Sequence, residues 1–509
     1  MADASTTAPA QTVGAEPPPE ATEAARPSLV GTLGRWSRAL REIAGSARLP
    51  FTGGDDPDLP AEQADRLRAQ MQACLEARGG EVLARAQAAN IATAYLGLSA
   101  IGRARFFELL ATEFGVERDA VEAAIADYRA AEEEGERLRA ERALRRALVT
   151  PGMRLLTKFN ALPGGMKLLV EMRADLLALN HDDPALRALD HDFRHLLATW
   201  FDVGFLDRRR LTWDTPASLL EKIIEYEAVH EIRSWTDLRH RLHGDRRCYA
   251  FFHPSLPEEP LIFVQVALVE GLAARIEPLL DEASPSLDPK RADSAIFYSI
   301  TSTLYGLRGI SFGSFLIKQV VDDLAHDLPN LRQFATLSPM PGLLAWLDQH
   351  ELDGLGQEER GRLGALADDV EHLRAALAGG AWLADEALSG VLEPLLMRAA
   401  ARYLIARDGD GLPIDSVARF HLGNGARIER VNWLADRSPL RLQQSAGLMV
   451  NYLYDPPEIE HNHAAFAGQQ TITVAPELND LLKGAPAELT ARVRVSRRAG
   501  GLGRMIRRS

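Results

Sequence analysis

The sequence predicts an α+β fold, in which an all-helical N-terminal bundle precedes a mixed α/β domain. Between residues 60 and 205 apolar residues recur with helical spacing; Phe106, Leu109, Leu110 and Phe114 fall at i, i+3, i+4 and i+8. No segment of that range is typical of a strand. From about residue 206, runs of β-branched and aromatic residues alternate with helical segments. A chain of 509 residues can build two or more domains, each with its own core.

The N-terminal segment, residues 1–59, is rich in Ala, Pro, Thr and Glu, and we expect it to be disordered or weakly ordered, with a short helix over 30–46. It lacks the apolar stretch of a secretory signal. The two cysteines, Cys74 and Cys248, lie far apart in the sequence, which excludes a disulfide framework and a four-cysteine zinc site. These features favour a reducing compartment, and we expect a cytoplasmic protein.

The helical domain, residues 60–205, is interrupted at Pro151-Gly152 and at Pro163-Gly164-Gly165, where helices should end or begin. No polar cluster within it is typical of a catalytic site. The domain is therefore expected either to support the rest of the protein or to present a partner surface, with self-association as one such role.

The second domain, residues 206–509, is predicted to be mixed. Residues 248–269 contain two apolar runs separated by a Pro-rich turn, which is typical of paired strands. The other predicted elements are a strand at 294–301, a helix at 314–328, a strand at 334–339 that ends at Pro339, a helical insert at about 350–406, and a hairpin at 419–436 whose turn is Gly423-Asn424-Gly425.

Composition limits the classes of partner. The formal net charge of −13 argues against binding to nucleic acid or an anionic membrane, which need a positive field. No run of about 18 apolar residues is present, so the sequence predicts no membrane span. A small anionic ligand remains possible, because an acidic protein can contain a local basic pocket.

The segment "YGLRGISFGS", residues 305–314, is the strongest candidate for such a pocket. A strand, a glycine-rich turn and a helix N-terminus in this order form a natural anion site, because the first helical N–H groups lack acceptors and the helix dipole is positive there. Gly306, Gly309 and Gly313 would let the backbone approach a ligand. Arg308 adds a positive charge. On the local sequence alone, a purely structural turn is equally plausible.

"RGISFG" resembles the R/Q-x-x-G-x-G/A loop of the GNAT acyltransferase superfamily, which holds the pyrophosphate of coenzyme A at a helix N-terminus. Ser311 stands where that motif has its middle glycine. The P-loop pattern GxxxxGK[ST] and the dinucleotide pattern GxGxxG followed by an acidic residue are both absent.

A set of segments in one order closely resembles the malonyl-CoA decarboxylase family: "HPSLPEEPLIFVQVAL", "FYSITSTLYGLRGISFG", "FLIKQVVDDL", "LSPMPG", "FHLGNGARIERVNWLADRSP" and "QSAGLMVNYLYD". This resemblance covers most of residues 206–455. It implies a GNAT-like catalytic domain that decarboxylates malonyl-CoA to acetyl-CoA and carbon dioxide without biotin, thiamine or a metal. It also suggests a homo-oligomer assembled through the helical domain.

The resemblance implies two sets of site residues. A catalytic Ser–His pair maps onto Ser338 and His421. The loop that contacts coenzyme A maps onto Arg308, Gly309, Ile310, Ser311, Phe312, Gly313 and Ser314.

The reaction needs groups of these types. Loss of carbon dioxide leaves an enolate whose charge lies largely on the thioester oxygen, where hydrogen-bond donors stabilise it. The α-carbon must then receive a proton, which suits a histidine. Without the resemblance, Ser338 could be a turn residue before proline, and His421 a buried histidine on a strand. The fold and loop alone would also permit an acyl-CoA-dependent N-acyltransferase.

Other polar residues have two interpretations each. His253, Asn432, Asn451, Tyr452 and Tyr454 could line a pocket or form core hydrogen bonds. Lys318 could approach a phosphate or be solvated. His191 and His195 are spaced to hold a metal on a helix but lack the Glu of HExxH, so a solvated helix face is favoured. The "HNH" sequence at 461–463 is expected in a polar loop.

Overall fold

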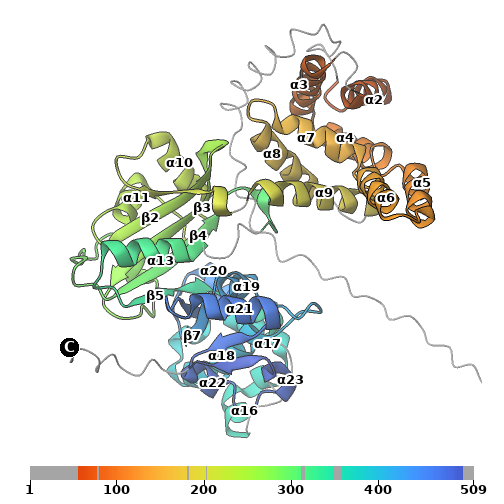
Figure 1. The fold of residues 1–509 in the computed structure, drawn as a ribbon. Helices are drawn as coiled ribbons and strands as arrows, with labels where there is room; N and C mark the ends of the chain where they lie inside the picture. The colour runs from red at the N-terminus through yellow and green to blue at the C-terminus, as the bar shows by residue number, and fades with distance from the viewer. Residues whose placement is uncertain are drawn as a thin grey trace, which may run out of the picture.

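The structure, a computed structural model, describes residues 56–76, 80–179, 183–201, 203–310, 316–347 and 357–496. These residues form three neighbouring bodies: a helical region, a sheet with helices on both faces, and a third, largely helical part into which the sheet continues (Figure 1). Most of the N-terminal segment, including the predicted helix at 30–46, lies outside the described residues.

The helical region confirms the prediction for this part of the chain, since no strand occurs among its described residues before residue 207. The residues predicted to share one helix face, Phe106, Leu109, Leu110 and Phe114, are all buried. The helices are α2 (Ala61–Glu76), α3 (Glu81–Gly97), α4 (Ala100–Glu113), α5 (Arg118–Ala130), α6 (Glu134–Ala147), α7 (Pro151–Asn160), α8 (Gly165–Leu177) and α9 (Pro184–Trp200).

The described strands form one sheet in the order β1-β2-β3-β4-β5-β8-β7-β9-β10, with β6 paired to β8. Strands β1 to β4 are antiparallel, whereas β4 and β5 are parallel. Between β5 and β8 the pairing is limited to Ala335 and Leu453, so the sheet is almost divided there. The strands are β1 (Asp207–Leu211), β2 (Arg246–His253), β3 (Leu256–Val269), β4 (Ser294–Ser302), β5 (Gln333–Thr336), β6 (Ser338–Pro339), β7 (Arg427–Asn432), β8 (Met449–Leu453), β9 (Ile472–Val474) and β10 (Val493–Val495).

Side-chain alternation along β2 explains how helices cover both faces of the sheet. Tyr249 and Phe251 belong to the large core that also contains the apolar face of α13 (Leu316–Asp327). Cys248, Ala250 and Phe252 point the other way and pack against α10 (Ala217–Tyr226) and α11 (Trp235–Leu242). The predicted strands at 248–269 and 294–301 and the predicted helix that ends near 328 are thus confirmed.

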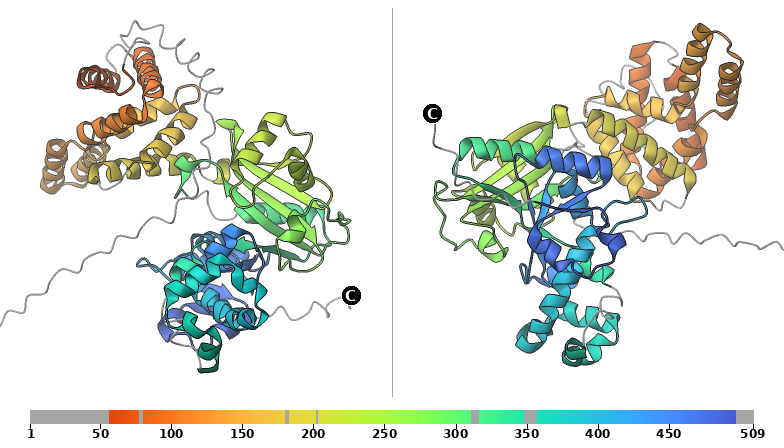
Figure 2. Two further views of the ribbon diagram at one scale, coloured as in Figure 1. Left: turned by 180° about the vertical axis from the view of Figure 1, so that it is seen from behind. Right: turned by 60° about the horizontal axis from the view of Figure 1, so that its bottom comes forward.

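The third body contains the predicted helical insert and the helices that follow it (Figure 2). The insert is confirmed as helical over its described residues. Its elements are α16 (Gln357–Leu363), η3 (Gly364–Ala367), α17 (Val370–Gly379), η4 (Ala381–Ala384) and α18 (Glu386–Ile405). The helices outside the insert are α14 (Leu343–Trp346), α19 (Ser416–Gly423), α20 (Pro439–Ser445), α21 (Ile459–Gln469), α22 (Pro476–Leu481) and α23 (Ala487–Thr490), and the short elements elsewhere are η1 (Val203–Phe205), α12 (Glu277–Leu280) and η2 (Tyr305–Leu307).

The predicted hairpin at 419–436 is wrong in its first half. Residues 416–423 form the helix α19, and only 427–432 form a strand, β7. Asp415 caps the helix, because its Oδ1 accepts a hydrogen bond from the Ala418 N–H at 2.6 Å. The Gly-Asn-Gly segment ends this helix instead of joining two strands, and Gly425 supplies the positive φ of +84° that the reversal needs.

Three smaller expectations also differ from the structure. Residues 461–463 lie in the helix α21 and not in a polar loop. The Pro-rich turn before β3 is short, since Pro257 and Pro260 already belong to that strand. The predicted strand at 334–339 is interrupted at Leu337, whose N–H donates to Phe297 O at 3.0 Å.

Within the described ranges, none of the helices has the length and apolar character needed to cross a membrane.

Candidate functional site

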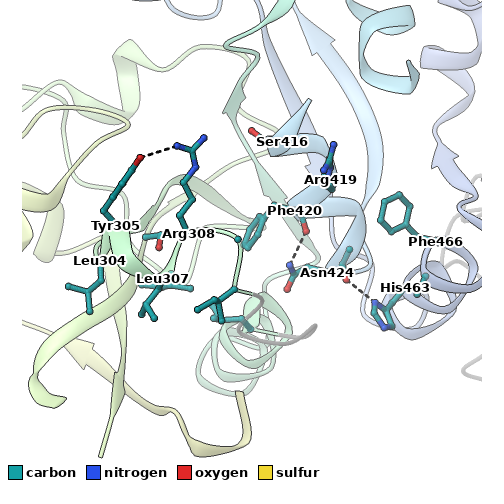
Figure 3. A pocket seen from close by; sticks show the side chains of 17 residues that line it. Leu304, Tyr305, Leu307, Arg308, Ser416, Arg419, Phe420, Asn424, His463 and Phe466 are labelled. Atoms are coloured by element: carbon teal, nitrogen blue, oxygen red, sulfur yellow. Dashed lines mark hydrogen bonds between the residues drawn. The ribbon is translucent and has the colours of Figure 1, made fainter. Parts of the chain in front are cut away.

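A cavity of about 780 Å³ lies between the segment that follows β4 and the helices α19 and α21 (Figure 3). One wall consists of Ile262, Ser302, Leu304, Tyr305, Leu307, Arg308, Gly309 and Ile310, together with Leu316 at the start of α13. The opposite wall consists of Ser416, Arg419, Phe420, Gly423 and Asn424 of α19 and its C-terminus, with His463, Phe466 and Ala467 of α21.

The predicted coenzyme A loop contributes directly to this cavity. Arg308, Gly309 and Ile310 line it, whereas Ser311, Phe312, Gly313 and Ser314 lie outside the described residues. The Arg308 side chain is exposed, its Nη1 lies 3.4 Å from the Tyr305 hydroxyl, and no carboxylate in the described ranges forms an ion pair with it. Gly309 has a φ of +73°, so the backbone reversal beside Arg308 needs this glycine.

Gly306 has a packing role. A Cβ atom at this position would lie 1.8 Å from the Val170 carbonyl oxygen of α8, so only glycine allows the segment to approach that helix. The glycines of the segment therefore serve different purposes, which their spacing in the sequence could not distinguish.

The two predicted catalytic residues lie together. Ser338 on β6 and His421 on α19 are both buried, and Ser338 Oγ is 3.1 Å from His421 Nε2. Ser338 Oγ also donates a hydrogen bond to Thr336 Oγ1 at 2.9 Å. They meet at β8, because β6 pairs with this strand and the Tyr452 ring of the same strand stacks on His421.

Two tyrosines from β8 and the residues just after it hold the imidazole of His421. Tyr454 Oη lies 2.8 Å from Nδ1, and the Tyr452 ring stacks on the imidazole with 4.5 Å between ring centroids. Burial lowers the pKa of His421 to about 3, so the imidazole is neutral at neutral pH. Burial also raises the pKa of Tyr454 well above its usual value, so its hydroxyl stays protonated.

The hydrogen-bond network assigns the tautomer of this neutral imidazole. Since the single Ser338 hydroxyl proton is given to Thr336, the imidazole must donate from Nε2 to Ser338 Oγ. Nδ1 then accepts the proton of the Tyr454 hydroxyl. The arrangement therefore differs from a Ser-His-Asp triad, in which a carboxylate holds the imidazole.

The helix α19 connects the pair with the cavity. Ser416, Arg419, Phe420 and Gly423 follow one another at helical spacing on the cavity side. Ser338 and His421 are not among the described residues that line the cavity. One short helix thus forms a cavity wall and also carries the histidine.

The remaining candidates fall outside the cavity lining. The pKa of His253 is lowered by burial, and its Nδ1 accepts from the Ser255 N–H at 3.1 Å. Asn432 Nδ2 donates to Asn451 Oδ1 at 2.8 Å, and Asn451 Nδ2 donates to Thr336 O at 2.6 Å. Because Tyr452 and Asn451 are neighbours on one strand, Asn451 points to the face opposite His421. Lys318 lies near Asp322 and Glu460, at 3.4 and 3.6 Å.

No group of three or more His, Cys, Asp or Glu side chains in the described parts of the chain is arranged to hold a metal ion. His191 and His195 are exposed on α9, as expected for a solvated helix face. His463 lines the cavity, and its Nδ1–H donates to Gly423 O at 2.8 Å.

Sequence reasoning missed the cavity wall formed by α19 and α21. It includes Arg419, whose guanidinium is 2.9 Å from Asp408 Oδ2. Asp415 three residues before Ala418, followed by apolar residues at helical spacing, was a signal for α19. No local sequence signal could have predicted that α21 packs beside α19.

Comparisons with known proteins show which family the chain is similar to. Residues 204–492 match the family model "Malonyl-CoA decarboxylase C-terminal domain", and residues 114–201 match "Malonyl-CoA decarboxylase N-terminal domain". The mitochondrial malonyl-CoA decarboxylase of Mus musculus is 37% identical over 423 residues, which are 78% of this chain and 86% of the relative. That of Anser anser anser is 36% identical over 406 residues, 75% of this chain and 81% of the relative.

Solved structures show the same likeness. Malonyl-CoA decarboxylase from Rhodopseudomonas palustris is 43% identical with a TM-score of 0.74, covering 82% of this chain and 99% of that chain. The protein from Agrobacterium vitis is 42% identical with a TM-score of 0.73 and the same coverages, 82% and 99%.

Proposed function

This chain belongs to the malonyl-CoA decarboxylase family, and from that membership we propose that it is a carboxy-lyase that converts malonyl-CoA into acetyl-CoA and carbon dioxide. The comparisons do not favour the alternative, an acyl-CoA-dependent N-acyltransferase. The observation that carries the proposal within the structure is the buried Ser338–His421 pair, with 3.1 Å between Oγ and Nε2.

We propose that Ser338 and His421 stabilise the enolate and supply the proton that it receives. Cleavage of the bond between the α-carbon and the carboxylate releases carbon dioxide and leaves the electron pair on the enolate, mainly on the thioester oxygen. A donor aimed at that oxygen typically contributes about 3 kcal/mol to the stability of the transition state. We propose that Ser338 Oγ–H or the imidazole N–H, which donate to Thr336 and to Ser338 in the structure, turns to this oxygen when the substrate binds, at a buried place where such a bond is stronger than in water.

Each turnover consumes one proton, which must reach the α-carbon. We propose that the malonyl carboxylate, on binding beside the pair, raises the pKa of His421 from its low value, because a nearby negative charge favours the imidazolium. The imidazolium gives its proton to the enolate carbon, directly or through Ser338 Oγ, and returns to neutral imidazole. Carbon dioxide and acetyl-CoA are the products.

The cavity is the proposed site for the coenzyme A part of the substrate. Its wall carries Arg308, an exposed cation free to meet a phosphate, and the backbone of Gly309. Ser311, Phe312, Gly313 and Ser314 remain part of this proposal on the strength of the family resemblance alone.

We further propose that the reaction needs no organic cofactor and no metal, since the thioester itself accepts the electron pair. Dialysis against a chelator should leave turnover unchanged; a loss that Zn²⁺ or Mg²⁺ restores would contradict this.

A cytoplasmic location and a homo-oligomer formed through the helical region are also proposals. The names of the animal relatives place those proteins in mitochondria. Fractionation of the source cells tests the location, and the mass of the purified full chain in solution tests the assembly.

The experiment for the proposed activity is to incubate the pure full chain with malonyl-CoA alone, without an amine acceptor. Acetyl-CoA and carbon dioxide should form in equal amounts. Absence of both products from folded protein would contradict the decarboxylase, whereas turnover only in the presence of an amine would support the acyltransferase.

A further inference from the structure

Among the described residues, Arg173 of α8 joins the helical region to the cavity wall by side-chain hydrogen bonds. Arg173 is only 2% exposed, and its Nη1 donates to two carbonyl oxygens of the cavity segment, Gly306 O at 2.7 Å and Arg308 O at 2.8 Å. Its Nε donates to Asp190 Oδ1 of α9 at 2.8 Å, which fixes the plane of the guanidinium. A charged group thus ties the backbone of the proposed phosphate-binding segment to a helix about 130 residues away in the sequence.

The same face of α8 makes two further contacts with the sheet region. Val170 O packs against Gly306, where even a Cβ atom would not fit. Lys167 Nζ lies 2.6 Å from Glu259 Oε1 of β3, and both side chains are buried. Lys167, Val170 and Arg173 recur every three residues and therefore lie along one side of the helix. The cavity segment is held against this side of α8, and Figure 1 shows that the helical region meets the sheet region there.

We propose that Arg173 is a positioning residue for substrate binding, and that the helical region completes the coenzyme A site. Arg308 is the residue whose carbonyl Arg173 holds, and its side chain lines the cavity. A small movement of this backbone therefore changes where the Arg308 cation lies. Because Arg173 touches neither Ser338 nor His421, its loss should weaken binding far more than it slows the chemical step. This inference rests on the proposed function for the identity of the ligand.

The test compares Arg173→Lys with a matched control, Arg103→Lys, in the full chain. Arg103 belongs to the same helical region, and its Nη1 donates to Asp175 Oδ2 at 2.8 Å, within that region. A lysine at 173 keeps the charge but cannot reach two carbonyls and a carboxylate from a planar fork. Three quantities are measured: hydrogen exchange of residues 304–310 without ligand, affinity for coenzyme A by calorimetry, and kcat and KM for malonyl-CoA.

We expect Arg173→Lys to speed exchange in 304–310 and to weaken coenzyme A binding about tenfold or more, as for the loss of a charge-assisted hydrogen bond. KM should rise in parallel while kcat changes by less than about threefold. Arg103→Lys should leave all three near wild type. Unchanged exchange and unchanged coenzyme A affinity in folded Arg173→Lys would overturn the inference, as would a fall in kcat with KM unchanged.

If Arg173→Lys does not fold, Gly306→Ala displaces the same segment from α8 through its contact with Val170 and should give the same pattern. The two hypotheses can fail separately. Wild-type protein without decarboxylase activity would refute the proposed function, whereas the exchange and coenzyme A measurements would still decide whether Arg173 positions the segment.

Discussion

His421 is held on three sides by uncharged groups: Ser338 Oγ at Nε2, Tyr454 Oη at Nδ1, and the Tyr452 ring against its face. Nothing charged contributes to its pKa, which burial alone lowers. In this setting the Ser338 hydroxyl, which donates to Thr336, places the imidazole proton on Nε2, and the Tyr454 hydroxyl donates to Nδ1. The sequence identified Ser338 and His421 through family resemblance, but it could not show that a tyrosine would occupy the position that a carboxylate has in a catalytic triad.

We expect Tyr454→Phe to lower kcat about tenfold, the size of one lost hydrogen bond that orients a reacting group, with KM nearly unchanged. The phenylalanine ring keeps the packing against Phe297, whose centroid lies 6.1 Å from that of Tyr454. Steady-state kinetics on malonyl-CoA measures both constants. A wild-type kcat in this variant would show that the hydroxyl does not orient His421.

Asn451 should act on stability and not on turnover. It is fully buried, lies on the opposite face of β8 from Tyr452, and links β7 to Thr336 O of β5. Asn451→Ala leaves buried polar groups without partners, and we expect it to lower the free energy of unfolding by about 2 kcal/mol. Urea denaturation measures this change. A large loss of kcat at unchanged stability would contradict this and would show that Asn451 takes part in the reaction.

The helix α19 carries His421 and forms a wall of the cavity, yet most of its residues were predicted to belong to a hairpin. Gly423-Asn424-Gly425 between apolar residues is a strong hairpin signal, so residues 419–436 were predicted as two strands. The competing signal was the Asp415 cap, which starts a helix whose buried face is Ala418, His421 and Leu422. The paired strands at 248–269 were easier to predict, because both runs are apolar on both faces and uninterrupted by a capping residue.

Gly425 should therefore be irreplaceable at the junction of α19 and β7. A Cβ atom there would lie 2.2 Å from the Ile459 carbonyl oxygen, and the φ of +84° disfavours any side chain. We expect Gly425→Ala to lower the free energy of unfolding by about 2 kcal/mol or more.

Gly409→Ala is the matched control for this change. It lies in the same body of the protein, with open space around the position of its Cβ. Chemical denaturation of both variants measures the difference, and equal stabilities would contradict the tight packing assigned to Gly425.

On the scale of the whole molecule, the site depends on contacts between distant parts of the chain. Ser338 and His421 are 83 residues apart, and Arg173 reaches the cavity segment from the helical region. Hydrophobic spacing predicts helices and strands because it depends on neighbours in the sequence. It carries no information on the limited pairing between β5 and β8, or on the docking of α8. The fold class and the cavity wall formed by the predicted loop could thus be predicted, whereas the opposite wall, formed by α19 and α21, could not.

Two buried histidines should make the protein less stable in acid. Burial lowers the pKa of His421 to about 3 and is also the main cause that lowers the pKa of His230 to about 3. Below about pH 6.5 the unfolded chain binds protons at these two histidines, whereas the folded chain does not. The free energy of unfolding therefore falls as the pH falls from about 6.5 toward 3. Above about pH 6.5 these histidines do not change it.

Each histidine should cost about 1 kcal/mol between pH 7 and pH 5.5. We therefore expect His421→Gln to lose about that much less stability than wild type over this interval. Denaturation at the two pH values gives the difference, and identical losses in the two proteins would mean that folded His421 titrates normally.

The kcat of His421→Gln on malonyl-CoA is the most direct test of the proposed chemistry. The variant must remain folded and bind coenzyme A with nearly wild-type affinity, since His421 does not line the described part of the cavity. If His421 protonates the enolate, kcat should fall by about 100-fold or more. Production of acetyl-CoA and carbon dioxide at a rate close to that of wild type would contradict the assignment of His421.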